Sequence, residues 1–580
     1  MSTTVAHRIE NAEVARVLRE IADLLEVKGE NAFRIRAYRN AARVVEELPH
    51  AVQDAGTNGY APLTDLPGIG EDLAGKIATI ARTGALPLVR QLRRSAPAGA
   101  AELMHVRGIG PKRARALSRK LGVHSVADLS KAVRGHKLRT LPGFGARTED
   151  ALQRELSART SDERRTQRAT AIQYAEEVAR YLRESGGIER VELAGSLRRC
   201  RETVGDIDVL AASDDPAAVV ERFTSYPGTS AVLERGDTLA SIRLESGLQL
   251  DLRVVEPASF GAALHYFTGS KAHNIAVRRL AQRKGLKLNE YGVYRGTRRI
   301  AGRDEREVFA AVGLPWIPPE LREARGEIEA AKHDALPRLV TLADIRGDLQ
   351  SHTTDSDGRD TLDAMAHAAQ ALGYEYLAVT DHTPAVRVAG GLDAAGFRRQ
   401  WKRIERLNAR LRGLTILRGV EVDIHADGTL DLDDECLRGF DIVIAAMHSG
   451  FDLSRSAQTK RLLRAIEHPA VHLIGHPTGR VIGRRQPIAL DLDAICRAAA
   501  DHGVALEVNG QPERLDLDDI MARRAIQLGV RLVIDTDAHS TAELRFMRWG
   551  VDQARRGWVT RRDVLNTRPL SQVVRWLARR

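Results

Sequence analysis

The sequence predicts a multidomain chain of mixed α and α/β class, with a helical N-terminal region, an α+β middle domain and a distorted C-terminal β/α barrel. Its 580 residues correspond to roughly four folded units at about 150 residues per domain. A Gly-x-Gly phrase recurs before helix-forming stretches in residues 1–150. Alternation typical of strands appears between 169 and 313. Beyond 338, strand and helix patterns alternate, as expected for βα units around a parallel sheet or barrel.

Composition narrows the class of protein. Hydrophobic residues make up 43% of the chain, which is enough for folded cores, and no run of about 18 apolar residues could span a bilayer. The polar stretch 1–11 does not resemble a signal peptide. The three cysteines, Cys200, Cys436 and Cys496, lie too far apart for a disulfide framework or a cysteine zinc site. We therefore expect a cytoplasmic protein with no membrane partner.

The charge balance favours a polyanionic partner. Lys and Arg number 88 against 77 Asp and Glu, which gives a formal net charge of +11. Such an excess suits nucleic acid, although a basic surface can also serve solubility alone. Nucleic acid is therefore the working hypothesis for the partner.

Three glycine-rich phrases predict phosphate contacts near the N-terminus. Segments 66–70, 106–110 and 141–145 each follow a turn signal and precede a helix-like stretch, such as 111–121. Glycines before a helix N-terminus bring bare N–H groups close to a phosphate, whereas one such phrase alone would more often be an ordinary turn. The repeated phrases resemble helix-hairpin-helix motifs, which hold the DNA backbone without reading sequence. The candidate DNA-binding residues are Gly68, Gly70, Gly108, Gly110, Lys112, Arg113, Gly143 and Gly145.

Acidic residues on two predicted strands of the middle domain indicate a divalent-metal site. Strand alternation in 205–209 puts Asp206 and Asp208 on one face, and the same alternation in 249–254 exposes Asp251 on what we expect to be a nearby strand. Three neighbouring carboxylates repel unless cations neutralise them, and paired Mg²⁺ is the solution used for phosphoryl transfer. The alternative is an edge strand with solvent-facing acids.

Four short motifs surround these carboxylates. Their order is Gly-Ser-x-Arg-Arg at 195–199, Gly-Asp-x-Asp at 205–208, Asp-x-Arg at 251–253 and Tyr-Phe-x-Gly-Ser at 266–270. A turn such as 195–199 offers backbone N–H groups, a hydroxyl and guanidinium groups to triphosphate oxygens. In order and spacing, residues 1–318 resemble the X family of DNA polymerases, which have a nucleotidyltransferase palm. The resemblance implies a template-directed polymerase that fills short gaps in primed DNA with dNTPs during base excision repair.

The resemblance also implies a role for each motif residue. Asp206, Asp208 and Asp251 would hold two Mg²⁺ (or Mn²⁺) ions, and Asp251 would favour loss of the primer 3′-hydroxyl proton. Arg253 would organise the acidic cluster. The residues expected at the triphosphate, the sugar and the base of the incoming nucleotide are Ser196, Arg199, Gly205, Arg253, Tyr266, Phe267, Gly269 and Asn274.

Some positions depart from the family pattern. Lys76 matches the lysine that attacks a 5′-deoxyribose phosphate in members with lyase activity, and the alternative is an exposed helix lysine. Asp72 stands in the same helix, where some relatives have basic residues. Gln249 occupies a position, two residues before Asp251, where an arginine often stands. Asp72 weakens the lyase assignment, whereas the motifs of the polymerase core are intact.

Histidines and acids follow the predicted strands of the C-terminal region. The apolar runs 376–379, 415–417, 442–446, 471–474, 504–508 and 531–534 are each expected to be a strand. In a β/α barrel the strand C-termini converge on one mouth, so side chains just past them can surround a common centre. A single histidine there would more often be structural, but repetition at strand after strand favours a metal site.

Residues 338–575 resemble the polymerase-and-histidinol-phosphatase (PHP) domain. The resemblance implies two or three Mn²⁺ or Zn²⁺ ions, a bridging Glu421, and phosphoester hydrolysis by metal-activated water. The expected activity is a 3′–5′ exonuclease, with abasic-site cleavage as a further activity. Gln350 replaces the first histidine of the usual His-x-His and would weaken or empty one metal subsite. The implied ligands are His352, Asp357, His382, Glu421, His448, His476, Asp537 and His539.

The predicted organisation joins these parts in a monomeric enzyme. One rival is a PHP small-molecule phosphatase that a noncatalytic N-terminal half tethers to DNA. Another is a noncatalytic DNA-bridging protein, which the acidic clusters disfavour because carboxylates without cations would repel the duplex. The expected domains are a lyase-like helix-hairpin-helix domain (1–90), a helical DNA-binding region of the fingers type with further hairpins (91–168), the palm (169–260), a nucleotide-selecting subdomain (261–318), a linker (319–337) and the PHP domain (338–580).

Overall fold

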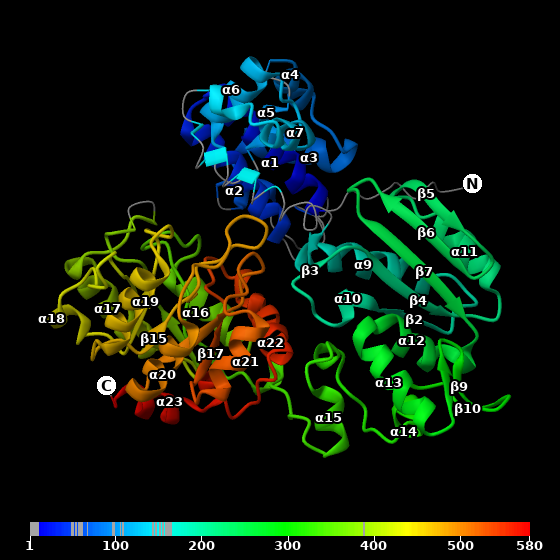
Figure 1. Cartoon of the computed structure of the whole chain (residues 1–580). Coiled ribbons are helices and arrows are strands. Elements are labelled where there is room, and N and C mark those ends of the chain that lie inside the picture. Colours follow the sequence, from blue (N-terminus) through cyan, green and yellow to red (C-terminus); the bar gives the residue numbers. More distant parts are fainter. Residues whose placement is uncertain are drawn as a thin grey trace. The chain divides into compact units, whose positions relative to one another are not determined.

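The chain, in a computed structural model, divides into two compact units (Figure 1). One comprises Met1–Arg165 with Gly483–Arg485, and the other comprises Thr166–Ile482 with Gln486–Arg580. The structure describes residues 11–579 except for positions 48–51, 53–54, 56–61, 67, 96–98, 105, 107–108, 142–143, 146–147, 150–151, 154–155, 157–164 and 387–388.

The first unit is helical, as predicted. Apolar residues at Val14, Leu18, Ile21 and Leu25 recur at helical spacing along its first helix and are buried in one core. A second core contains residues of the two later hairpin segments, among them Phe144, and of the helices beside them. The helices are α1 (Asn11–Lys28), α2 (Ala32–Glu47), α3 (Glu71–Thr83), α4 (Pro87–Ser95), α5 (Ala100–Leu103), α6 (Pro111–Leu121) and α7 (Val126–Arg134).

The second unit begins with the α+β domain that the sequence predicted. Its five-stranded sheet has the order β2-β4-β7-β6-β5, and β4 and β7 are the parallel pair at its centre. Helices α9 and α11 pack on the sheet and on each other. The elements are β1 (Thr166–Gln167), α9 (Arg168–Arg183), β2 (Arg190–Leu193), α10 (Gly195–Arg198), β3 (Thr203–Val204), β4 (Ile207–Ala212), α11 (Pro216–Thr224), β5 (Thr229–Arg235), β6 (Leu239–Leu244) and β7 (Gln249–Val255).

A smaller helical subdomain follows the sheet. It has its own core, which includes Val277, Phe309 and Leu321, and a three-stranded antiparallel sheet of order β10-β9-β8. The predicted linker 319–337 is folded, because it carries a short helix and the fully buried side chain of Arg322. The elements are α12 (Phe260–Thr268), α13 (Lys271–Arg283), β8 (Lys287–Asn289), β9 (Gly292–Arg295), β10 (Arg298–Ala301), α14 (Glu305–Ala311) and α15 (Glu327–Lys332).

The C-terminal part is a nearly closed barrel of seven parallel strands in sequence order, β11 to β17. A parallel bridge between Ser351 and Ala538 brings the first and last strands together. Strand alternation divides the core, because Tyr376 and Ala378 face one apolar cluster and Leu377 and Val379 face another that also contains the surrounding helices.

The seven strands of the barrel are β11 (Gly347–Asp348), β12 (Tyr376–Val379), β13 (Thr415–Asp423), β14 (Ile442–Ala446), β15 (Leu473–Ile474), β16 (Ala505–Asn509) and β17 (Leu532–Asp535). The helices are α16 (Leu362–Ala371), α17 (Ala394–Asn408), α18 (Asp434–Leu437), α19 (Arg455–Glu467), α20 (Leu492–His502), α21 (Asp519–Gln527), α22 (Met547–Arg556) and α23 (Leu570–Leu577). Among the described residues, no helix is both long and apolar enough to span a bilayer.

Candidate metal centres

The predicted barrel ligands lie at one mouth of the barrel. His382 and His448 come just after β12 and β14, Glu421 lies near the end of β13, and Asp537 follows β17. Because all seven strands are parallel, their C-terminal ends lie at the same end of the barrel. The topology therefore gathers side chains that are far apart in sequence.

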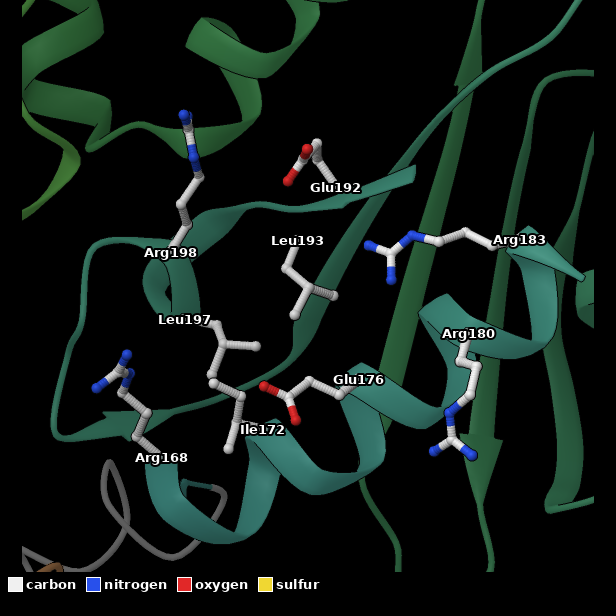
Figure 2. A pocket seen from close by; sticks show the side chains of 9 residues that line it. All are labelled: Arg168, Ile172, Glu176, Arg180, Arg183, Glu192, Leu193, Leu197 and Arg198. Carbon is white, nitrogen blue, oxygen red and sulfur yellow. The ribbon is translucent and has the colours of Figure 1, made fainter. Parts of the chain in front are cut away.

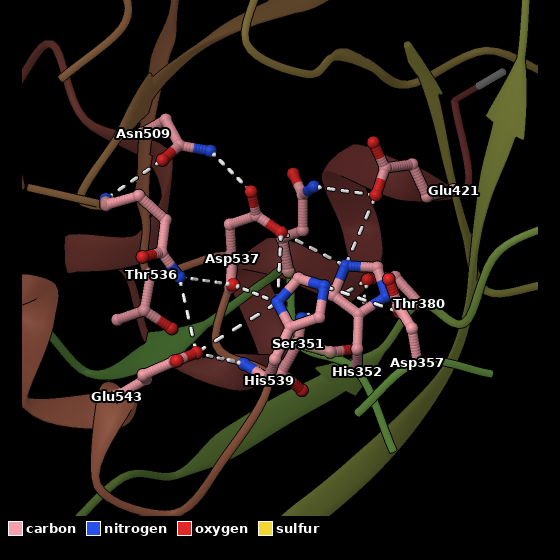
Figure 3. Close-up of polar contacts among 12 residues, drawn as sticks. Ser351, His352, Asp357, Thr380, Glu421, Asn509, Thr536, Asp537, His539 and Glu543 are labelled. Atoms are coloured by element: carbon pink, nitrogen blue, oxygen red, sulfur yellow. Dashed lines mark hydrogen bonds and ion pairs between the residues drawn. The ribbon is translucent and has the colours of Figure 1, made fainter. Parts of the chain in front are cut away.

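Most of these side chains belong to three overlapping clusters. Within each cluster, the ligand atoms lie within 4.8 Å of one another. Figure 3 shows the centre of this arrangement, where His352 Nε2 lies 3.2 Å from Glu421 Oε2 and 3.1 Å from Asp537 Oδ1. His476 is in none of the three clusters, but its Nε2 lies 2.9 Å from Glu421 Oε1. The clusters are His352, Asp357, His382 and His539; His382, Glu421 and His448; and His352, Glu421 and Asp537.

The electrostatics of the barrel site suit cation binding. Burial favours the neutral form of Glu421, but hydrogen bonds from His352 and His448 hold its pKa well below the usual range. Burial likewise opposes the charged form of His448, yet Asp423 and Glu421 raise its pKa to about 9. Burial lowers the pKa of His382 to about 3, so its imidazole is neutral and can donate a lone pair to a metal ion. The site thus combines ionised carboxylates with imidazoles in a dry environment.

Three supporting residues were not foreseen from the sequence. Asp423 lies 3.0 Å from His448 Nδ1 and fixes that ring. The backbone N–H of His476 donates to Glu507. The backbone N–H of His539 donates to Glu543 (Figure 3). Glu543 also pairs with Arg359. Strand alternation carried a signal for Asp423, since it stands two residues after Glu421 on the same strand face.

Gln350 is buried where the family usually has a histidine. Its Nε2 donates to Glu421 Oε2 at 3.1 Å, and its Oε1 accepts no hydrogen bond from the described residues. An amide oxygen can bind Mn²⁺, although it is a weaker ligand for Zn²⁺ than imidazole. The mixture of imidazole and carboxylate around it fits Mn²⁺ or Zn²⁺.

The polymerase-type carboxylates lie on the parallel pair β4 and β7. Asp208 is directly opposite Asp251 in the register, and Asp206 is in the bend just before β4. Burial first, and then the charges of Asp206 and Asp251, raise the pKa of Asp208 to about 7. The charges of these three carboxylates therefore act on one another. Among the described residues, their oxygens do not all lie within 4.8 Å of one another, unlike the ligand atoms of each barrel cluster, as expected for like charges.

A glycine packs directly on this acidic site. Gly195 has φ +60°, and a Cβ there would lie 1.8 Å from Asp208 Oδ2. Only glycine fits both the backbone conformation and this close approach. The turn that begins the Gly-Ser-x-Arg-Arg motif is thereby held against the carboxylate.

Most of the predicted nucleotide-binding residues lie near this turn. Ser196 is in the first turn of α10, and Gly205 is in the bend that leads to β4. Arg199 donates from Nη1 to the carbonyl of Thr268 at 2.5 Å, and a Cβ on Gly269 would lie 3.1 Å from that same nitrogen. The Arg-Arg turn and the end of α12 are thus joined.

The aromatic residues of the Tyr-Phe-x-Gly-Ser motif pack on each other and on arginine. Tyr266 and Phe267 meet edge to face, with ring centroids 5.1 Å apart. Arg253 lies over the Phe267 ring at 5.6 Å. Asn274 Nδ2 donates to the carbonyl of Tyr266 at 2.6 Å. These contacts connect β7 to α12 and α13 beside the acidic site.

The hairpin glycines are described in part. Gly68 has the positive φ that the motif predicts, at +73°, and Gly70 and Gly110 are the N-cap residues of α3 and α6. Gly145 is also described, and its carbonyl accepts from the backbone N–H of Glu149. The two remaining glycines, Gly108 and Gly143, lie outside the described residues, as does the side chain of Lys112.

Two of the basic residues that the sequence analysis singled out in the first unit contact neighbouring side chains. Arg113 lies over the ring of Phe144 at 5.4 Å. Lys76 pairs with Asp72 at 2.5 Å and lies over Tyr38. Although burial opposes it, the hydrogen bond to Asp72 raises the pKa of Lys76. Because a nucleophilic lysine must be neutral, this contact works against a lyase role.

A cavity of about 590 Å³ lies between α9, β2 and α10. Figure 2 shows arginines and glutamates together around it. Arg198 forms an ion pair with Glu305 at 2.7 Å, and Arg168 forms one with Asp552 at 2.7 Å. Two of the lining arginines are therefore already neutralised by carboxylates. Its lining residues are Arg168, Ile172, Glu176, Arg180, Arg183, Glu192, Leu193, Leu197 and Arg198.

Comparison with known proteins identifies the family. Models for two helix-hairpin-helix domains match residues 9–86 and 100–158, the DNA polymerase beta thumb matches 263–323, and the PHP domain matches 348–511. A Bacillus subtilis (strain 168) protein named DNA polymerase/3′-5′ exonuclease PolX is 39% identical over 571 residues, which cover 98% of this chain and 99% of that protein. The chain belongs to the PolX family of X-family DNA polymerases. The family that the sequence motifs indicated is thus confirmed.

Other relatives match a smaller part of the chain. A probable phosphatase of Thermoanaerobacter sp. (strain X514) is 28% identical over 233 residues, which cover 38% of this chain and 89% of that protein. A probable phosphatase of Acetivibrio thermocellus is 32% identical over 209 residues, with 34% and 80% covered. The match to a PolX protein covers 98% of this chain, whereas each of these phosphatases covers 38% of it or less.

Proposed function

We propose that this PolX-family chain is a template-directed DNA polymerase with a metal-dependent 3′–5′ exonuclease in its barrel. The observation that carries the polymerase assignment is the register of the parallel pair, which places Asp208 opposite Asp251 beside the turn that bears Ser196 and Arg199. The exonuclease assignment rests on the ligand clusters at the barrel mouth. Both centres lie in the second compact unit.

In the polymerase site, Asp206, Asp208 and Asp251 would hold two Mg²⁺ (or Mn²⁺) ions. Bound there, the ions would neutralise developing charge on the triphosphate and lower the pKa of the primer 3′-hydroxyl. Asp251 would favour removal of that proton. Arg199 would bind the triphosphate with Ser196 and Gly205.

The remaining nucleotide contacts follow from the packing around the motif aromatics. Tyr266, Phe267 and Gly269 would contact the sugar of the incoming dNTP and exclude ribonucleotides. Asn274 would contact the base, and Arg253, which favours the ionised form of Asp208, would organise the acidic cluster. These roles rest on the match of each residue to the family motif.

In the barrel, two or three Mn²⁺ or Zn²⁺ ions would be held by the clustered histidines and carboxylates, with Glu421 between subsites. Such ions supply an activated water for phosphoester hydrolysis. Asp423 would keep the ring of His448 oriented, because it contacts the Nδ1 atom of that ring. Cleavage at abasic sites is a further proposed activity of the same centre.

Primer extension and degradation on a gapped duplex test this proposal. Asp206→Ala should abolish incorporation of dNTPs while DNA binding and Mn²⁺-dependent degradation remain. His352→Ala or His448→Ala should abolish degradation and leave incorporation intact. Incorporation by the Asp206 variant would remove the polymerase site, and normal degradation by both histidine variants would remove the nuclease site.

The proposed biological substrate is gapped or primed DNA in base excision repair. The proposed enzyme is a monomer. The helix-hairpin-helix matches and the basic charge of the chain support contacts with the DNA backbone. Lys76 as a lyase nucleophile is a separate proposal. Borohydride trapping on a 5′-deoxyribose phosphate end tests it, with Lys76→Ala as the control that must abolish trapping.

The likeness to probable phosphatases supports a second candidate function, that of a small-molecule phosphatase. In that case the barrel would hydrolyse small phosphate monoesters and the N-terminal half would only tether it to DNA. Assays of the full chain on DNA ends and on phosphate monoesters distinguish the two candidates. The family match over 98% of the chain favours DNA as the substrate.

A further inference from the structure

One face of the barrel helix α22 contacts the polymerase part of the same compact unit. Trp549 lies under the guanidinium of Arg168 at 5.0 Å, and Asp552 pairs with Arg168 at 2.7 Å. Arg556 continues this face one turn further along the helix. The spacing of these three helix residues, i, i+3 and i+7, places them on one side. Helix α22 also packs on β16 and β17, so this face is fixed to the barrel.

Arg556 is the most thoroughly bound residue of this face. It is 4% exposed. Its Nη1 donates to the carbonyl of Arg199 at 2.7 Å and to Glu323 Oε1 at 3.0 Å. Its Nη2 donates to Asp519 Oδ2 at 2.6 Å, which fixes the guanidinium from the barrel side. A barrel side chain therefore contacts the backbone of the proposed triphosphate-binding motif.

Glu323 carries this contact to a side chain of the polymerase site. The same oxygen, Oε1, that accepts from Arg556 also accepts from Arg199 Nε at 3.1 Å. Although burial opposes ionisation, Arg199 and Arg556 together lower the pKa of Glu323. The carboxylate is thus an ionised bridge between two guanidinium groups. Both of its partners are charged, which makes these hydrogen bonds stronger than neutral ones.

Arg199 is held in a defined orientation by these contacts. Its Nε is bound to Glu323 and its Nη1 to the carbonyl of Thr268. Among the described residues, none hydrogen-bonds the remaining terminal nitrogen, Nη2. A guanidinium fixed at two nitrogens loses little side-chain entropy when the third meets a phosphate oxygen.

We infer that Arg556 and Glu323 are positioning residues of the polymerase site, so that the nuclease barrel supplies part of the architecture that binds the incoming dNTP. The inference rests on the proposed role of Arg199 as a triphosphate contact. It assigns no new chemistry to the barrel. It makes nucleotide affinity depend on a residue of the nuclease domain that lies outside the metal clusters.

Steady-state incorporation on a gapped duplex tests this inference. Arg556→Gln removes the charged link to Glu323 and should raise KM for the dNTP about tenfold, since charge-assisted hydrogen bonds of this kind are strong. We expect a smaller change in kcat. Mn²⁺-dependent degradation by the same preparation should equal that of the unaltered chain, which also shows that the barrel is folded.

A matched control comes from the adjacent residue of the same helix. Arg555 also forms an ion pair with a residue outside the barrel, Glu320, at 2.8 Å, but within the described part of the chain it makes no hydrogen bond or ion pair with Arg199. Arg555→Gln should leave KM for the dNTP within about twofold of the unaltered value, because its partners lie away from the site. Equal increases in KM for Arg555→Gln and Arg556→Gln would indicate general loosening and overturn the inference.

A double-substitution cycle separates the inference from its premise. Arg199→Ala should raise KM for the dNTP, and Arg556→Gln should add little in that background, because both act through one guanidinium. If Arg199→Ala raises KM and Arg556→Gln does not, Arg556 has no positioning role, but Arg199 keeps its proposed role as a triphosphate contact. If Arg199→Ala leaves KM unchanged, the premise fails and the inference with it. Glu323→Gln, which keeps an acceptor but loses the charge, should reproduce the Arg556 effect if Arg556→Gln folds poorly.

Discussion

At the scale of single residues, the surroundings of Asp208 favour cation binding at the proposed polymerase metal site. It is opposite Asp251 on the neighbouring strand, and Gly195 packs against its carboxylate. Burial, together with the charges of Asp206 and Asp251, raises the pKa of Asp208 to about 7. A carboxylate in this position gains most from a divalent cation, which removes the repulsion.

This pKa makes metal binding at the polymerase site pH-dependent. Below about pH 7 the proton and the cation compete for Asp208, so the apparent affinity for Mg²⁺ should fall by roughly tenfold per pH unit. Above pH 7 the carboxylate is ionised and the affinity should level off. Calorimetric titration of a His352→Ala variant with Mg²⁺ at several pH values measures this apparent affinity. An affinity that is constant across the neutral range would contradict the account.

Gln350 offers a second test at this scale. Its amide contacts Glu421 in the place where the family usually has a histidine. Gln350→His would supply an imidazole to the site, so the barrel should retain more Mn²⁺ or Zn²⁺ after dialysis. Metal analysis of the purified variant against the unaltered chain checks this. Equal metal content in the two proteins would show that position 350 is not a ligand.

The sequence could predict which side chains gather at the barrel mouth because their signal is local. A histidine or acid just after an apolar run, such as His382 after 376–379, needs only strand topology to reach the site. Residues that act through a ring or a backbone amide, such as Glu543 with the N–H of His539, carry no such local mark. Their role depends on loop conformation, which the pattern of hydrophobic residues does not determine.

At the scale of elements, strand prediction succeeded where strands are buried. The predicted runs 376–379 and 442–446 have the bounds of β12 and β14. The strand β5 was not predicted, because it is a sheet edge whose residues are mostly exposed and lack apolar alternation. β13 extends to Asp423, beyond the predicted 415–417, since Gly419 and Glu421 interrupt the apolar run.

The segment after β17 is held by one carboxylate, which gives a prediction for that element. Glu543 accepts from the backbone N–H of His539 and pairs with Arg359. Glu543→Gln should reduce exonuclease activity by about ten- to 100-fold, the usual effect of losing a group that orients a ligand. Incorporation of dNTPs should be unchanged. Rates of primer degradation in Mn²⁺ measure the effect, and full exonuclease activity would show that the loop does not need this contact.

At the scale of the whole molecule, the polymerase and barrel parts of the second unit are joined by paired charges. Arg480 and Glu202 form an ion pair at 2.6 Å, and Arg168 and Asp552 form another. These partners are hundreds of residues apart in the sequence. No periodicity or motif could have predicted them, because charged residues give no local indication of a distant partner.

Separating the barrel should therefore lower its stability. A fragment of residues 338–580 would expose the α22 face, including Trp549, which is 6% exposed in the full chain. It would also leave Asp552 and Arg556 without Arg168 and Glu323. Thermal unfolding should begin at a lower temperature in the fragment than in the full chain, since buried charges that lose their partners are destabilising. Equal unfolding temperatures would indicate that the two parts are independent.

We propose that one chain holds two separate metal centres. In one the ligands are carboxylates alone, and in the other they are histidines and carboxylates. Anomalous diffraction from crystals of the full chain soaked in Mn²⁺ with primed DNA and a dNTP analogue tests it most directly. We expect peaks between Asp206, Asp208 and Asp251 and a second group of peaks at the barrel mouth. Peaks confined to one of the two places, or located away from both, would contradict it.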